Sequence, residues 1–198
     1  METGKIMNNN LMPIHMKTSR NRFISSILFA SLLFVSTGCQ NQSEKTELNK
    51  LKATVKIQDQ NKETVRQLFT AIDNQNFDKL NELFSDDFSL SAEGLDKPWK
   101  KEDVFQDIKR YYTSFPDWHH EIKDMIAEGD KVAIKIMQTG TQKAQFEEIA
   151  PKNTKVTKSA MHVVTIVNGK IKEWWAIEND LGLMLQLGMV LKPKEEKR

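Results

Sequence analysis

The chain has 198 residues, of which 39% are hydrophobic and 28% are charged, a balance typical of one globular domain. Four of its 29 basic residues and one of its 27 acidic residues lie in residues 1–38, so the remainder carries a net charge of −1. Because it has neither a basic excess nor a basic stripe, binding of nucleic acid is not expected. The single cysteine, Cys39, excludes an intramolecular disulfide.

The N-terminal segment has the pattern of an export signal. Two arginines precede an apolar run of about 13 residues, which Ser36, Thr37, Gly38 and Cys39 follow. The run is shorter than the roughly 20 residues of a membrane-spanning helix. A cysteine directly after small residues resembles the bacterial lipobox, which implies a signal peptide at 1–38, lipidation of Cys39, and a domain anchored to a membrane of the cell envelope, outside the cytoplasm. The alternatives are an uncleaved anchor or ordinary cleavage nearby.

Residues 39–60 are a polar spacer, with Leu48, Leu51 and Val55 at helical spacing. The spacer is either a flexible linker or a helix continuous with the next element. The folded domain is predicted at 61–190, with Asn61 as a helix cap, and a charged tail follows at 191–198.

Helices come first in the domain and strands come after them. Apolar periodicity predicts helices over 61–72, 77–84 and 101–112, with a brief strand at 88–90. Alternating patterns then predict strands over 119–127, 132–136, 155–167 and 171–178, and a short helix over 181–187 closes the domain. This order predicts an α+β fold, with helices covering one face of a curved antiparallel sheet.

The second hairpin predicts which side chains share a face. Asn168-Gly169 favours a two-residue type I′ turn, which places His162 opposite Trp175. Alternation then gives one face to Lys158, His162, Glu173, Trp175 and Asn179. This mixed set either lines a pocket or is solvated, and the sequence leaves both alternatives open.

The order of several short motifs resembles the SnoaL-like polyketide (ester) cyclase family of the nuclear transport factor 2-like superfamily. The motifs are Phe115-Pro116-Asp117, Ala127-Glu128-Gly129-Asp130, Gly140-Thr141, Gly169-Lys170-Ile171, Glu173, Trp175, Leu181-Gly182-Leu183 and Gln186-Leu187-Gly188. The resemblance spans about residues 61–188. It implies a cone-shaped barrel of a curved sheet wrapped on about three N-terminal helices, a cavity for a small molecule, no metal or organic cofactor, and a homodimer as one option.

The same resemblance indicates which residues form the site. The catalytic aspartate of the family falls on Asn179, and an amide is no proton acceptor at ordinary pH. The remaining candidate bases are His162, Glu173 and Asp180. The candidate ligand-binding residues are Lys135, Lys158, Trp175, Ile177 and Asn179. His119-His120 is not expected to bind a metal, because adjacent strand residues point to opposite faces.

Two functions of different classes follow from these residues. The first is a binding module that holds a small, partly apolar molecule in an internal cavity. The second is a cofactor-independent cyclase or isomerase that uses acid–base residues, and it gains support if two of His162, Glu173 and Asp180 converge on the cavity. Both depend on His162 and Trp175 facing the same enclosed space.

Overall fold

A computed structural model describes the backbone of residues 20–192 and the side chains of residues 42–192. The predicted signal peptide, the Cys39 thiol and most of the charged tail lie outside the residues whose side chains are described. The chain divides into two compact units, residues 1–50 and 51–198. In the described part of the first unit the backbone is helical. The described residues include no helix that is both long and apolar enough to cross a membrane.

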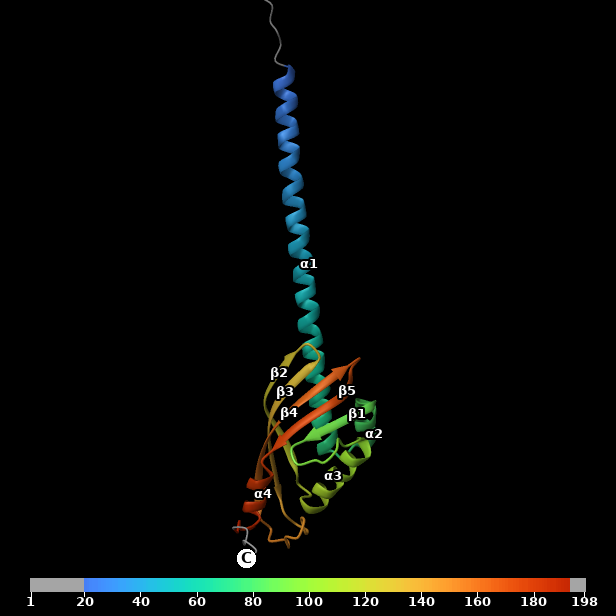
Figure 1. The fold of residues 1–198 in the computed structure, drawn as a ribbon, viewed down its shortest axis with the longest axis vertical. Coiled ribbons are helices and arrows are strands. Elements are labelled where there is room, and N and C mark those ends of the chain that lie inside the picture. The colour runs from blue at the N-terminus through green and yellow to red at the C-terminus, as the bar shows by residue number, and fades with distance from the viewer. Residues whose placement is uncertain (1–19, 193–198) are drawn as a thin grey trace, which may run out of the picture. The chain divides into compact units, whose positions relative to one another are not determined.

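The second unit holds one curved, unclosed sheet of five strands (Figure 1). The described helices are α1 (Arg20–Asp73), α2 (Phe77–Leu83), α3 (Lys101–Ser114) and α4 (Asp180–Gln186). The strands are β1 (Phe84–Ala92), β2 (His119–Glu128), β3 (Lys131–Thr141), β4 (Lys155–Val167) and β5 (Lys170–Glu178). Their order in the sheet is β1-β5-β4-β3-β2, with β1 parallel to β5 and the other pairs antiparallel. The α+β prediction is confirmed.

Helix α1 does not begin at Asn61, so the predicted cap is wrong. The helix runs through this position, and the buried Asn61 amide donates to the Gly129 carbonyl, 3.1 Å away, in the turn between β2 and β3. Residues 39–73 contain no glycine or proline, so the sequence holds no signal that would end the helix. The alternative of a helical spacer continuous with the next element is the one that the structure shows.

The core lies between the concave face of the sheet and the helices. The C-terminal part of α1 passes behind the strands, while α2 and α3 lie beside β1 (Figure 1). From α1, the Phe69 ring packs edge-on against Trp174, with centroids 6.1 Å apart. On β3, Gly140 admits the Trp118 indole, because a Cβ at this position would lie 2.5 Å from Trp118 Cε3.

The predicted register of the β4–β5 hairpin is wrong beyond its first pairs. Asn168 and Gly169 have the positive φ of the predicted turn, and Val167 pairs with Lys170 as expected. The register then shifts, because Ile166 pairs with Ile171 whereas Thr165 pairs with Glu173. The residue between these partners on β5 is therefore extra, as in a β-bulge.

This shift moves the distal part of β5 by one residue and exchanges its two faces. His162 pairs with Ala176, while Trp175 pairs with Val163 on the opposite face. Trp174 is buried on the concave side, and Trp175 is 44% exposed on the convex side. The expectation that His162 and Trp175 face one enclosed space is therefore wrong, and Trp174 is the indole beside His162.

Candidate functional site

A cavity of about 640 Å³ lies between the concave face of the sheet and the helices. Aromatic side chains supply much of its wall, and these are Phe69, Trp99, Tyr111, Tyr112, Trp118, Phe146 and Trp174. Its lining residues come from the strands on one side and from α1, α3 and α4 on the other. Its volume lies within the roughly 300–1,000 Å³ of ordinary small-molecule sites.

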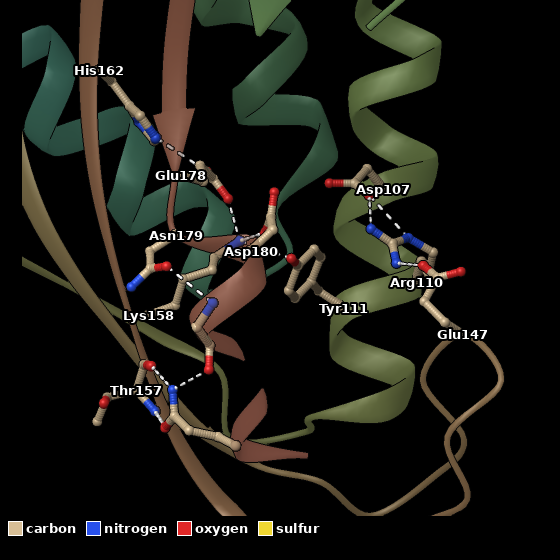
Figure 2. Close-up of polar contacts among 12 residues, drawn as sticks. Asp107, Arg110, Tyr111, Glu147, Thr157, Lys158, His162, Glu178, Asn179 and Asp180 are labelled. Carbon is tan, nitrogen blue, oxygen red and sulfur yellow. Dashed lines mark hydrogen bonds and ion pairs between the residues drawn. The ribbon is translucent and has the colours of Figure 1, made fainter. Parts of the chain in front are cut away.

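Charged residues meet at one part of this cavity (Figure 2). The Lys158 ammonium lies 2.7 Å from the Tyr111 hydroxyl and 3.1 Å from Asp180 Oδ1, and it also contacts Glu178 Oε2. The second carboxylate oxygen of Glu178 lies 3.1 Å from His162 Nε2. One carboxylate therefore bridges the lysine and the histidine.

The strands explain this convergence. Lys158 and His162 lie four positions apart on β4, so both point to the concave face. Glu178 pairs with Ala160, which lies midway between them. Tyr111 reaches the same point from α3, and Asp180 reaches it from the first turn of α4.

The charges of this cluster determine its protonation. Burial alone would lower the pKa of Lys158, but the charges of Glu178, Tyr111 and Asp180 outweigh burial and raise it. Burial alone would raise the pKa of Glu178, but the His162 hydrogen bond and the Lys158 charge hold it well below its usual range. Burial raises the pKa of Tyr111 to about 12, although the Lys158 charge acts to lower it. At neutral pH the lysine and the glutamate are therefore ionised, and the tyrosine keeps its proton.

A second charged group lies on α3 at the cavity wall. The Arg110 guanidinium donates to Asp107 Oδ1 at 2.6 and 3.0 Å and also pairs with Glu147 of the β3–β4 loop. The guanidinium stacks 4.8 Å from the Phe146 ring. Burial raises the pKa of Asp107, against the opposing charge of Arg110. This group ties the loop to α3.

Four of the predicted site residues line the cavity, and three of them belong to its charged cluster. His162 is 2% exposed and Lys158 is buried, and Asp180 contacts Lys158 from α4. Two of the three candidate bases, His162 and Asp180, thus converge on the cavity. This is the arrangement that we expected to favour an enzyme.

Other predicted site residues lie elsewhere. Glu173 is exposed and accepts from the Thr165 hydroxyl, and Lys135 is exposed on the convex face. The Asn179 side chain accepts from the Gly182 amide at 3.0 Å and caps α4, pointing away from the cavity (Figure 2). Ile177 contacts the edge of the cavity but is 37% exposed. The one-residue shift of β5 accounts for Glu173 and Trp175, which it turns outward.

The sequence prediction missed Glu178, Tyr111 and Trp174 as site residues. The alternation that groups Glu173, Trp175 and Asn179 puts Glu178 on the opposite face, whereas the bulge earlier in β5 turns it to the concave face. In the structure Ile171 and Trp174, which lie three positions apart, are both buried. A regular strand puts such residues on opposite faces, so their common burial requires an extra residue between them.

The two adjacent histidines reach one carboxylate. His119 Nδ1 and His120 Nδ1 lie 2.7 and 2.6 Å from the two oxygens of Asp73, at the end of α1. The two side chains still differ in exposure, at 62% for His119 and 9% for His120, as alternation along a strand gives. Across the side chains that the structure describes, no group of three or more His, Cys, Asp or Glu residues could hold a metal ion.

Comparison with known proteins agrees with this architecture. The sequence profile described as SnoaL-like polyketide cyclase matches residues 62–187. The structure of AclR from Streptomyces galilaeus has a TM-score of 0.63 at 24% identity, over 68% of this chain and 99% of that chain. The structure of IdmH from Streptomyces antibioticus has a TM-score of 0.61 at 23% identity, over 65% of this chain and 99% of that chain. The structure of an LEH-like epoxide hydrolase from M. tuberculosis has a TM-score of 0.53 at 14% identity, over 66% of this chain and 90% of that chain.

At these identities the solved structures establish the fold, which is the nuclear transport factor 2-like fold of the SnoaL-like cyclases. No curated protein sequence matches the chain. The family profile covers more than half of the chain and includes every strand of the sheet. The protein therefore belongs to the SnoaL-like polyketide cyclase family.

Proposed function

We propose that the domain binds a small, partly apolar molecule in the cavity between the sheet and the helices. The observation that carries the proposal is the wall itself, which combines a largely aromatic lining with one cluster of charged groups. Sites for small organic molecules have this composition, because apolar surface supplies affinity and a few polar groups fix orientation. Membership of the family supports the same role.

Native mass spectrometry of the full chain purified from its host tests this proposal. We expect a retained small molecule, and we expect Ala176→Trp to abolish its retention, because Ala176 lines the cavity and a large ring there fills it. The matched control is Lys135→Trp, which puts the same ring on the convex face. Equal retention by the two variants, with circular dichroism showing both folded, would contradict the proposal.

Proton transfer without a metal or organic cofactor is the second candidate function, of the cyclase or isomerase class. The arrangement of His162 and Glu178 favours it, because an ionised carboxylate orients the imidazole for proton transfer. Lys158 holds the Tyr111 oxygen, which leaves the tyrosine proton free to stabilise an oxyanion. The base is then His162 rather than an aspartate at position 179.

Hydrogen–deuterium exchange at an acidic C–H of a carbonyl compound in D₂O tests this second function. Followed by proton NMR, the exchange catalysed by the full chain is expected to slow by about 10²–10⁴-fold in His162→Gln. Trp175→Phe, on the convex face, is the control and leaves the rate unchanged. No catalysis across a panel of such compounds would argue for the binding module alone.

The location of this activity is also a proposal. Lipidation of Cys39 would hold the domain on a membrane of the bacterial cell envelope, outside the cytoplasm, and the sequence before Cys39 supports this. Labelling with an alkyne fatty acid is expected to mark the wild-type chain and not Cys39→Ser. Labelling of both chains would contradict anchoring through this thiol.

A homodimer is the proposed assembly. Exposed Met161, Trp175 and Ile177 are close in register on the convex face, and such a patch is typical of a protein interface. Sedimentation of the full chain in detergent is expected to give a dimer that Trp175→Glu dissociates. A wild-type chain that sediments as a monomer would refute this assembly.

A further inference from the structure

One buried side chain in the wall of the cavity has a polar end that no other protein group contacts. Gln138 is 3% exposed and lines the cavity. Its amide makes no hydrogen bond with any residue that the structure describes. Buried polar side chains in proteins nearly always have a partner, so this amide points to a group that enters the cavity.

The Gln138 amide is open to the cavity and not sealed in the core. In the described part of the chain, two side-chain nitrogen or oxygen atoms are fully buried without a partner, and neither belongs to Gln138. An atom the size of a water molecule therefore reaches both Oε1 and Nε2 of this amide. Because Gln138 is otherwise buried and lines the cavity, that atom approaches from within the cavity.

The register places this amide in the middle of a polar row. Along β3 the concave face carries Ile134 and Ile136, both buried, and Gln138 follows them in the same alternation. Across the sheet, Gln138 pairs with His120 on β2 and with Lys158 on β4. Directly opposed residues share a face, so the three polar side chains form one row across three strands.

The two polar neighbours of Gln138 are held by other groups. The Lys158 ammonium has three N–H donors, and it already contacts three side chains of the charged cluster. His120 Nδ1 lies 2.6 Å from Asp73 Oδ1, which fixes the imidazole against the end of α1. Both ends of the Gln138 amide are therefore left for a bound molecule.

The chemistry of an amide limits what this molecule can present. Gln138 offers a donor, Nε2–H, beside an acceptor, Oε1. A single ligand oxygen meets only one of them with good geometry, whereas a group with N–H and C=O on one side meets both. A carboxylic acid has this shape, but at neutral pH it is ionised and has no proton for Oε1. A primary carboxamide or a lactam is neutral and fits.

We propose that Gln138 binds a primary carboxamide or lactam of the ligand through two parallel hydrogen bonds. Gln138 Nε2–H donates to the ligand oxygen, and the ligand N–H donates to Gln138 Oε1. This inference rests on the proposed binding function, because it names the polar group of the molecule in the same cavity. The apolar side chains around the amide lower the local dielectric, which strengthens such a pair.

Two probes that differ in one group test the inference on the full chain. They are adamantane-1-carboxamide and 1-adamantyl methyl ketone, which share the apolar cage and the carbonyl, and in the ketone a methyl group replaces the –NH₂. Isothermal titration calorimetry is expected to give an affinity at least about ten-fold higher for the carboxamide, because the ketone leaves Gln138 Oε1 without a donor.

Three variants locate this preference. In Gln138→Met the ratio of the two affinities is expected to fall to about one, because methionine has a similar length and no amide. Gln138→Asn draws the amide back by one methylene and is expected to lower the ratio as well. Gln106→Met is the matched control, because it makes the same replacement on the exposed surface of α3, outside the cavity, and keeps the ratio.

The outcomes separate this inference from the proposed function. Equal affinity of the wild-type chain for the two probes overturns the amide pair and leaves the cavity as a binding site. A preference for the carboxamide that persists in Gln138→Met overturns the assignment to Gln138, and Gln138→Asn decides this point if the methionine variant fails to fold. Failure of both probes to bind overturns the proposed function together with this inference.

Discussion

Replacing Lys158 with methionine leaves Glu178 without its ammonium partner inside the cavity. Lys158 is 1% exposed and the Glu178 side chain is 25% exposed, so the pair is largely buried. Removing one partner of a buried pair costs about 3–5 kcal/mol, because the other charge stays desolvated. The Asp180 carboxylate is 66% exposed, so its lost contact adds little. Methionine fills a similar volume, and we therefore expect a loss of about 3 kcal/mol in the free energy of unfolding.

Urea denaturation followed by circular dichroism at pH 7 measures this loss. With an m value of about 2 kcal/mol per molar, the midpoint is expected to fall by about 1.5 M. Adding Glu178→Gln to Lys158→Met removes the remaining charge, so the double variant is expected to be more stable than the single one. A loss below about 1 kcal/mol, or a double variant less stable than Lys158→Met, would refute the buried pair.

Three further changes test other contacts of the domain. The pKa of Glu178 is held below its usual value near 4.5, so the ionised carboxylate stabilises the folded state fully above that pH and less as the pH falls. In Glu178→Gln the free energy of unfolding should therefore depend less on pH between pH 5 and 2. Asp73→Asn removes the carboxylate that His120 Nδ1 contacts at 2.6 Å, and calorimetry should show a loss of about 1–3 kcal/mol. Gly140→Ala places a methyl group 2.5 Å from Trp118 Cε3, and this overpacking should lower the free energy of unfolding by about 1–3 kcal/mol. Urea denaturation measures the loss, and an unchanged midpoint would contradict the close approach.

The sequence predicted the fold well because the fold depends on repeated, redundant signals. The apolar face of α1 contains Val65, Leu68, Phe69 and Ile72, and all four are buried as their spacing indicates. The turn at Asn168 and Gly169 is fixed by its backbone chemistry, since both positions have positive φ. Several residues support each of these features, so one misjudged position does not change the result.

The candidate site was harder to predict because it depends on a single register. Trp174 and Trp175 are adjacent and chemically identical, so composition cannot decide which of them enters the cavity. One extra residue in β5 reverses the choice for every position beyond it. Glu178 follows the same shift: a regular strand would point it away from the site face, and in the structure it contacts both Lys158 and His162.

Electrostatics supplies a criterion that hydrophobic alternation lacks. In a regular hairpin without the bulge, Lys158 would oppose Asn179, and Glu178 would point to the convex face. The buried ammonium would then have no carboxylate directly across the strand, and an uncompensated buried charge is among the costliest features of a protein interior. The observed register instead pairs Ala160 with Glu178, which places the carboxylate between Lys158 and His162. Burial of a lysine on β4 thus favours the register that also orients the imidazole, so the charge pair that stabilises the sheet also defines the chemistry of the cavity.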